Sequence, residues 1–142
     1  MKRVLLALLA TATLAAFVGS AAASNDVIVL PFTKQGSVID SHYVGTAAGG
    51  VALDMQLSDK YWTGEIQHFT ATETLVWPGG RSLTAVLEGR FNNTTGATVL
   101  NGRVTSGWLQ GAQVHEEGQL VGFSFPIASF AGSLQLMPGS AD

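Results

Sequence analysis

Apolar and polar residues alternate over short runs through most of the chain after residue 24, and turn-forming residues separate the runs. A period of two is typical of strands that bury one face, and no apolar stripe with the helical period of 3.6 exceeds about two turns. The pattern predicts strands at Val27–Phe32, Val38–Val44, Val51–Leu57, Tyr61–Thr70, Glu73–Trp77, Ser82–Phe91, Ala97–Thr105, Leu109–Val114 and Gly132–Met137.

Short strands at this spacing, without helices between them, predict an all-β fold. We expect a single antiparallel barrel of about eight strands or a closely related sandwich. Turn residues support the assignment at Pro78-Gly79-Gly80, at Asn92 to Thr95 and at Ser106-Gly107. No change in composition marks a second domain.

The hairpin around Asn92 to Thr95 allows a prediction of register. A four-residue loop there pairs Phe91 with Gly96, which brings the apolar residues of both strands onto one face. A two-residue turn at Ser106-Gly107 would extend that face to the next strand. Gly102, Gly111 and Ala85 would then lie side by side on the inner face, where their small size leaves space for a ligand. These pairings predict a central ligand pocket lined by Leu83, Leu87, Leu100, Val104 and Leu109, with Trp62 and His68 contributing.

The N-terminal segment has the features of a secretory signal peptide. Lys2 and Arg3 precede an uncharged apolar run, and Ala21 and Ala23 suit cleavage before Ser24. We therefore expect residues 1–23 to be a helical signal peptide and residues 24–142 to be one all-β domain. The mature protein would be secreted or periplasmic. The sequence has no cysteine for a lipid anchor, so no stable membrane anchor is expected after cleavage.

Charge and cysteine content exclude several classes of function. Removing residues 1–23 leaves five Lys and Arg against ten Asp and Glu, a net charge of −5, which disfavours nucleic acid as a partner. Without cysteine the chain has no disulfide, no thiolate nucleophile and no Cys-ligated metal. No nucleotide, metal or hydrolase motif occurs after residue 23, and neither a cofactor nor a metal is expected.

The weak candidates for catalysis are His68, His42, Asp40 and His115, and none is assigned a catalytic role. Asp40 and His42 share a face if both lie on a strand, so the carboxylate could orient the imidazole. His68 would face the interior beside Trp62, where a hydrogen-bonded core histidine is the more common outcome. His115-Glu116-Glu117 is interpreted as a solvated hairpin end, because adjacent carboxylates prefer water.

Two segments carry a resemblance. GRFNNTTGATVLNGRVTSGWLQGAQVHEEGQL and FAGSLQLMPG are similar to segments of small exported bacterial proteins of no assigned function. The strand layout, with its repeated Gly-x-Phe and Gly-x-Leu steps, resembles the barrels of the allene oxide cyclase and dirigent group. The second resemblance implies a barrel only, since none of that group's functional residues matches a position here.

The function expected from these observations is binding or surface interaction by an exported barrel, with a small apolar molecule or a glycan as partner. Two alternatives remain open at this point. The first is a cofactor-free isomerase or cyclase that uses a cavity histidine as its base. The second is a self-associating envelope or matrix protein, which would present an exposed strand edge.

Overall fold

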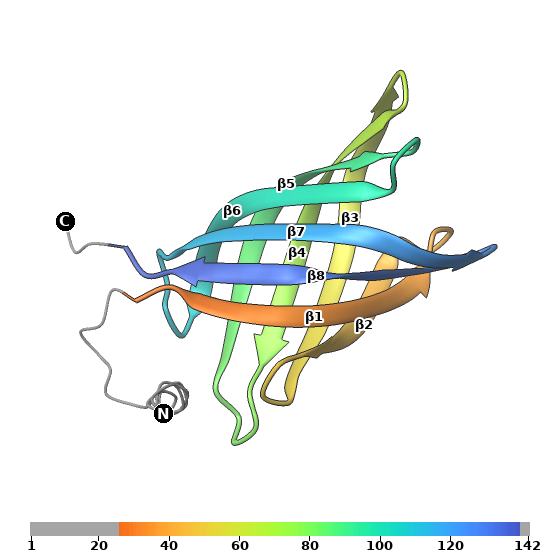
Figure 1. Cartoon of the computed structure of the whole chain (residues 1–142). Helices are drawn as coiled ribbons and strands as arrows, with labels where there is room; N and C mark the ends of the chain where they lie inside the picture. The colour runs from red at the N-terminus through yellow and green to blue at the C-terminus, as the bar shows by residue number, and fades with distance from the viewer. Residues whose placement is uncertain (1–25, 140–142) are drawn as a thin grey trace, which may run out of the picture.

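The computed structural model describes residues 26–139, which form one closed barrel of eight antiparallel strands (Figure 1). Each strand pairs with its neighbours along the chain, and β1 pairs with β8 to close the barrel. The all-β prediction is confirmed, and the barrel rather than the sandwich is the form adopted. The strands are β1 (Ile28–Ser37), β2 (His42–Ala47), β3 (Val51–Thr63), β4 (Ile66–Val76), β5 (Ser82–Asn92), β6 (Ala97–Gly107), β7 (Gln113–Ser124) and β8 (Ile127–Met137).

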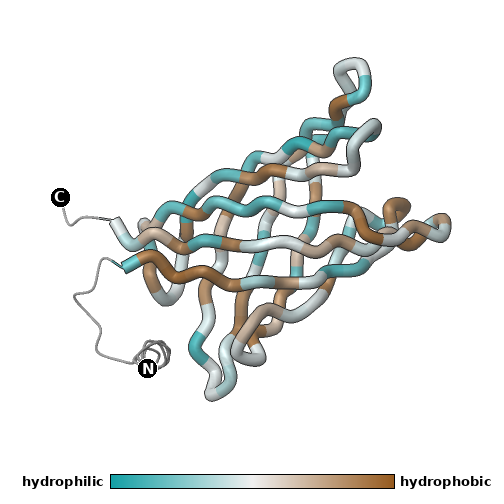
Figure 2. Tube along the Cα trace, in the orientation of Figure 1, coloured by the Kyte–Doolittle hydropathy of each residue, from teal (hydrophilic) through white to brown (hydrophobic). Residues whose placement is uncertain are grey.

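Alternation along the strands sorts side chains between the interior and the surface, and hydrophobic and hydrophilic residues interleave along the chain (Figure 2). In β1, Leu30, Phe32 and Lys34 are buried, whereas the residues between them are exposed. The predicted signal peptide lies outside the described residues. Within residues 26–139 no helix is long and apolar enough to span a bilayer.

The hairpin of β5 and β6 confirms the predicted inner face but not the predicted register. Leu83, Leu87, Leu100 and Val104 are all buried. Phe91 pairs with Thr98 instead of Gly96, a shift of two residues that keeps the predicted faces, and a further irregularity between Thr84 and Ala85 pairs Leu83 with Gly107. The loop is longer than expected because the Asn92 side chain accepts hydrogen bonds from two backbone N–H groups of the turn, those of Thr94 and Thr95.

The predicted turn at Ser106-Gly107 is wrong. β6 continues through Gly107, and the chain reverses over the next five residues. There the backbone N–H of Val104 donates to the carbonyl of Ala112, and Leu109 and Gly111 have positive φ values of 63° and 93°. Gly102 therefore pairs with Val114 and not with Gly111.

Three other predicted stretches also cross turns. Tyr61–Thr70 contains a tight turn at Gly64, whose φ is 61°, so its two halves belong to β3 and β4. Val38–Val44 begins in the turn between β1 and β2, and Leu109–Val114 begins in the turn before β7. The stretch Glu73–Trp77 is the end of β4 rather than a separate strand.

Candidate functional site: a cavity at one end of the barrel

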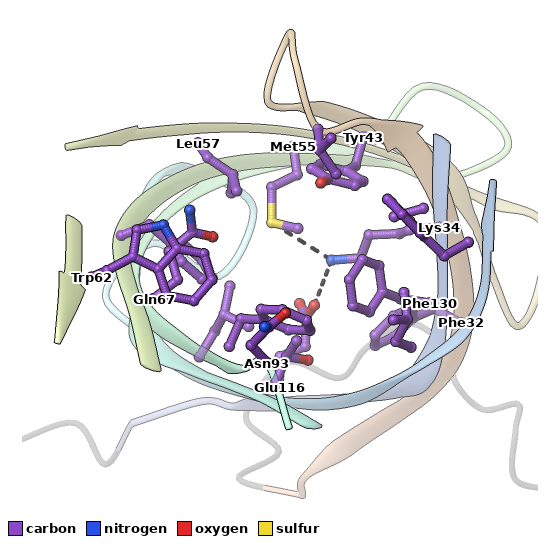
Figure 3. Close-up of a pocket in the computed structure, with 18 of the residues that line it drawn as sticks. Phe32, Lys34, Tyr43, Met55, Leu57, Trp62, Gln67, Asn93, Glu116 and Phe130 are labelled. Carbon is purple, nitrogen blue, oxygen red and sulfur yellow. Dashed lines mark hydrogen bonds and ion pairs between the residues drawn. The ribbon is translucent and has the colours of Figure 1, made fainter. Parts of the chain in front are cut away.

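A cavity of about 340 Å³ occupies the end of the barrel at which the β1–β2, β3–β4, β5–β6 and β7–β8 turns lie (Figures 1 and 3). Apolar and aromatic side chains dominate its wall. They are contributed by β1 to β8 and by the adjoining turns: Phe32, Val38, Tyr43, Met55, Leu57, Trp62, Phe69, Phe91, Leu100, Leu120, Phe123, Phe125, Ala128 and Phe130. The polar part of the wall consists of Lys34, Gln67, Asn93, Thr98 and Glu116.

The opposite end of the barrel is solid. Large side chains that are less than 2% exposed fill it, among them Leu75, Leu83, Leu87 and Leu136. The rings of Trp77 and Trp108 meet edge to face there, with centroids 4.9 Å apart. Their contact lies against the packed residues, so the interior is closed at this end.

Irregularities in two strands accompany the open end. β3 changes register between Ser58 and Tyr61, with Asp59 at a φ of 52°, and β7 changes register between Leu120 and Gly122. Such bulges bend a strand and increase its twist. Here they lie next to the hairpins that carry Trp62 and Phe123 to the mouth, where both side chains are about half exposed.

A buried lysine and two buried glutamates lie at the inner end of the cavity. Nζ of Lys34 lies 2.5 Å from Oε2 of Glu116 and 2.7 Å from Oε2 of Glu73. It also donates to Sδ of Met55 at 3.7 Å and lies 4.6 Å from the ring centroid of Phe32. Lys34 and Glu116 point into the cavity in Figure 3. Glu73, which is 0% exposed, lies behind them.

The electrostatics of this cluster follow from burial and from its uneven charge count. Burial raises the pKa of Glu73 to about 8, and the nearby Glu116 carboxylate contributes, while Lys34 opposes the change. Burial alone would favour the neutral amine of Lys34, but the two glutamates outweigh it and raise the pKa of Lys34. At neutral pH Lys34 is therefore an ammonium ion and Glu73 is protonated.

The predicted pocket residues divide between the two ends of the barrel. Leu100 and Trp62 lie in the wall of the cavity. Leu83, Leu87 and Val104 instead pack the solid part of the core. Leu109 lies in the turn before β7, partly buried against that core.

The histidines lie on the outer surface, which corrects the predicted inward position of His68. Its ring stacks on Tyr61, with centroids 4.8 Å apart, because the two residues pair across the β3–β4 hairpin and face outward together. Nε2 of His42 lies 2.9 Å from Oδ1 of Asp54 and makes no recorded contact with Asp40, which is in the turn before β2.

The interpretation of His115-Glu116-Glu117 as a hairpin end is also wrong, since all three residues lie within β7. The ring nitrogens of His115 lie 2.7 Å from Oδ1 of Asn101 and 2.8 Å from Oε2 of Glu117, on the outer face. Alternation then turns Glu116 inward, where it is 2% exposed.

The predicted site residues did not include Lys34, Glu73 or Glu116. Each of these three nevertheless occupies an inward-facing position next to apolar inward-facing residues of the same strand. Lys34 follows Leu30 and Phe32 at a spacing of two, Glu73 lies between Ala71 and Leu75, and Glu116 follows Val114. Opposite charges at such positions on separate strands are the signal that could have identified the cluster. Among residues 26–139, no group of three or more His, Cys, Asp or Glu side chains is placed to hold a metal ion.

Comparison of this chain with protein-family models, with curated proteins and with solved structures gives no match. Its function is therefore argued from the cavity itself.

Proposed function

We propose that the chain is an exported protein that binds one small, largely apolar molecule in the cavity of its barrel. The observation that carries the proposal is the contrast between the two ends of the interior. One end is packed solidly by leucine, whereas the other holds an aromatic-walled cavity of about 340 Å³ with an ion pair at its inner end. Ligand sites combine an apolar wall with a few fixed polar groups in this way.

The wall favours an apolar molecule over a glycan. Water in contact with the rings of Phe32, Phe69 and Phe130 is unfavourable, and an apolar molecule would release it. A glycan would need hydrogen-bond partners around its whole ring. The wall offers polar side chains mainly at the inner end and at Gln67, Asn93 and Thr98.

The two alternatives lack the features they require. An isomerase with a histidine base needs that histidine in the cavity, but none of the three in the sequence lines it. A self-associating sheet needs a free edge, and β1 and β8 pair along their length in the described barrel. The proposed location outside the cytoplasm rests on the charge, the apolar run and the cleavage site of residues 1–23.

Titration with the uncharged fluorescent probe N-phenyl-1-naphthylamine tests the proposal. We expect saturable fluorescence enhancement with one probe per mature chain. Ala128→Phe places a ring in the cavity, because Ala128 lines it, and should abolish the enhancement. The matched control is Ser129→Phe, at the next position on β8, whose side chain faces outward. Circular dichroism should show that both variants keep the barrel. Equal probe binding by the two folded variants would contradict the proposal.

A further inference from the structure

The interior of the barrel holds two acidic groups for one basic group. In the described part of the chain, the interior contains three ionisable side chains that are at least nine-tenths buried and that face one another: Lys34, Glu73 and Glu116. One ammonium group therefore serves two carboxyl groups. A buried charge without a partner is costly, so an occupant of the cavity will be selected by the charge it brings.

Lys34 has no free capacity for an anionic ligand. An ammonium group has three N–H donors. Those of Lys34 are directed to Oε2 of Glu116 and Sδ of Met55, with Oε2 of Glu73 at ion-pair distance and the Phe32 ring alongside. A ligand carboxylate would have to displace one of these contacts and would bring a third carboxyl group to a cluster that has one ammonium group.

Glu116 is the group that an occupant can reach. Its Oε2 accepts from Lys34, but its Oε1 is buried and has no hydrogen-bond partner, and Glu116 lines the cavity. Behind it, Oε1 of Glu73 also has no hydrogen-bond partner, and Oε2 of Glu73 has only the Lys34 ammonium group, at 2.7 Å. Once Glu73 loses its proton, the cluster has one ammonium group for two carboxylates, and a cationic N–H group in the cavity would supply the missing charge and a hydrogen-bond donor.

The rest of the wall also suits a cation with an apolar body. Aromatic rings line the cavity, including those of Phe32, Tyr43, Phe69 and Phe130. Aromatic faces attract cations, and the Phe32 ring already contacts the Lys34 ammonium group in this way.

We propose that the ligand is an apolar amine, bound as its ammonium ion with an N–H donated to Oε1 of Glu116. The proposal rests on the proposed function and adds the chemical class of the ligand. It predicts that amines are preferred over alcohols of the same shape, and that carboxylates bind most weakly.

A proton takes the place of the amine when the cavity is empty. The charged groups that face Glu73 are Lys34 from β1 and Glu116 from β7, while its paired neighbours on β3 and β5, Met55 and Ala85, bring no charge. With its pKa raised to about 8, Glu73 is protonated at neutral pH. An ammonium ion at Glu116 would lower that pKa, and the Glu73 proton would leave to solvent as the amine binds. Affinity should therefore rise as the pH increases from 6 to 8.

The test is a displacement titration of N-phenyl-1-naphthylamine by three compounds with one aromatic body. These are 2-(1-naphthyl)ethylamine, 2-(1-naphthyl)ethanol and 1-naphthylacetate. We expect the amine to bind at least tenfold more tightly than the alcohol at pH 8, and the acetate to bind most weakly. Calorimetry in buffers of different ionisation enthalpy should show proton release on amine binding at pH 7.

Glu116→Gln should remove the amine preference and retain alcohol binding. Its matched control is Glu117→Gln, the adjacent outward-facing residue, which should leave the preference unchanged. Glu116→Gln keeps one lysine and one glutamate in the interior, and thermal melting checks that it folds. If it does not fold, Glu73→Gln replaces it, since that variant removes the carboxyl group whose ionisation would balance a second ammonium ion, and it should also lose the preference.

The outcomes separate the two proposals. Equal binding of amine and alcohol, or tightest binding of the acetate, would overturn the amine assignment and leave the cavity function intact. A preference that persists in the folded Glu116→Gln or Glu73→Gln protein would also overturn it. Failure of the naphthylamine probe itself to bind would refute the proposed function.

Discussion

Nζ of Lys34 lies 2.5 Å from Oε2 of Glu116, although the two residues are 82 positions apart and lie on strands that are not neighbours. The contact crosses the interior from β1 to β7 and exists because β8 closes the barrel between them. It divides the interior, with packed leucine toward the start of β1 and the end of β8, and the cavity toward the β7–β8 turn. The ion pair is thus both part of the core and the polar end of the cavity.

Replacing Lys34 should destabilise the fold, mainly because two buried carboxyl groups would lose their cation and only to a small extent because of changed packing. Lys34→Met removes the one cation near two buried carboxyl groups, and we expect a loss of about 3–5 kcal/mol in the free energy of unfolding at pH 8. Gln35→Met, at the neighbouring exposed position, should change that free energy by less than about 0.5 kcal/mol. Urea unfolding measures both. Equal stabilities of the two variants would contradict a buried ion-pair cluster of Lys34, Glu73 and Glu116.

The buried Glu73 should make stability fall as the pH rises. Its pKa is about 8 in the folded chain against an ordinary value of 4.5, so between these values the folded state holds a proton that the unfolded state has released. Its contribution to the unfolding free energy should decrease by about 1.4 kcal/mol per pH unit from pH 4.5 to 8 and be level above pH 8.

Glu73→Gln isolates this contribution, because glutamine keeps the shape of the neutral acid and does not titrate. The stability of the variant relative to the unmodified protein should increase steadily between pH 5 and pH 8 in urea unfolding. Glu88→Gln, an exposed substitution on β5, is the control and should show no such increase. A constant difference for Glu73→Gln over this range would show that Glu73 is ionised throughout.

The two ends of the interior should respond differently to truncation. Leu87 is fully buried in the solid end, so Leu87→Ala should cost about 2–5 kcal/mol of unfolding free energy. Leu57 lies in the cavity wall and is only partly buried, so Leu57→Ala should cost about 1 kcal/mol or less. Chemical unfolding of the two variants compares them directly. Similar losses would mean that the open end is packed as tightly as the closed end.

Tryptophan emission should report occupation of the cavity through Trp62. This ring lies at the mouth and is 52% exposed, whereas Trp77 and Trp108 contact each other at the opposite end. Binding of 2-(1-naphthyl)ethanol should therefore change the emission of the unmodified protein and of Trp108→Phe, but not that of Trp62→Phe. A response that follows Trp108 instead would place the ligand at the wrong end of the barrel.

Alternation alone predicted an antiparallel barrel or sandwich, without deciding between the two, and it placed Leu87 and Leu100 on the inner face, where both are buried. The positions of turns were harder to predict. The β3–β4 turn at Gly64 was read as part of one continuous strand, which placed His68 beside Trp62. Across the real hairpin Trp62 pairs with Gln67 and Tyr61 pairs with His68, so the assignment reverses.

The buried charges escaped prediction for a different reason. Lysine and glutamate are almost never fully buried unless they are paired, so alternation on a single strand does not predict an interior position for them. The pairing itself depends on closure between β1 and β8, which brings together residues on three strands far apart in sequence. No local pattern carries that information.

Native mass spectrometry of the mature protein, purified gently from its own host, would detect a ligand retained in the cavity. We expect a native mass that exceeds the denatured mass by one small molecule per chain, and an Ala128→Phe protein prepared in the same way should lack that excess. Identical native and denatured masses for the unmodified protein would contradict the claim that the cavity binds a ligand.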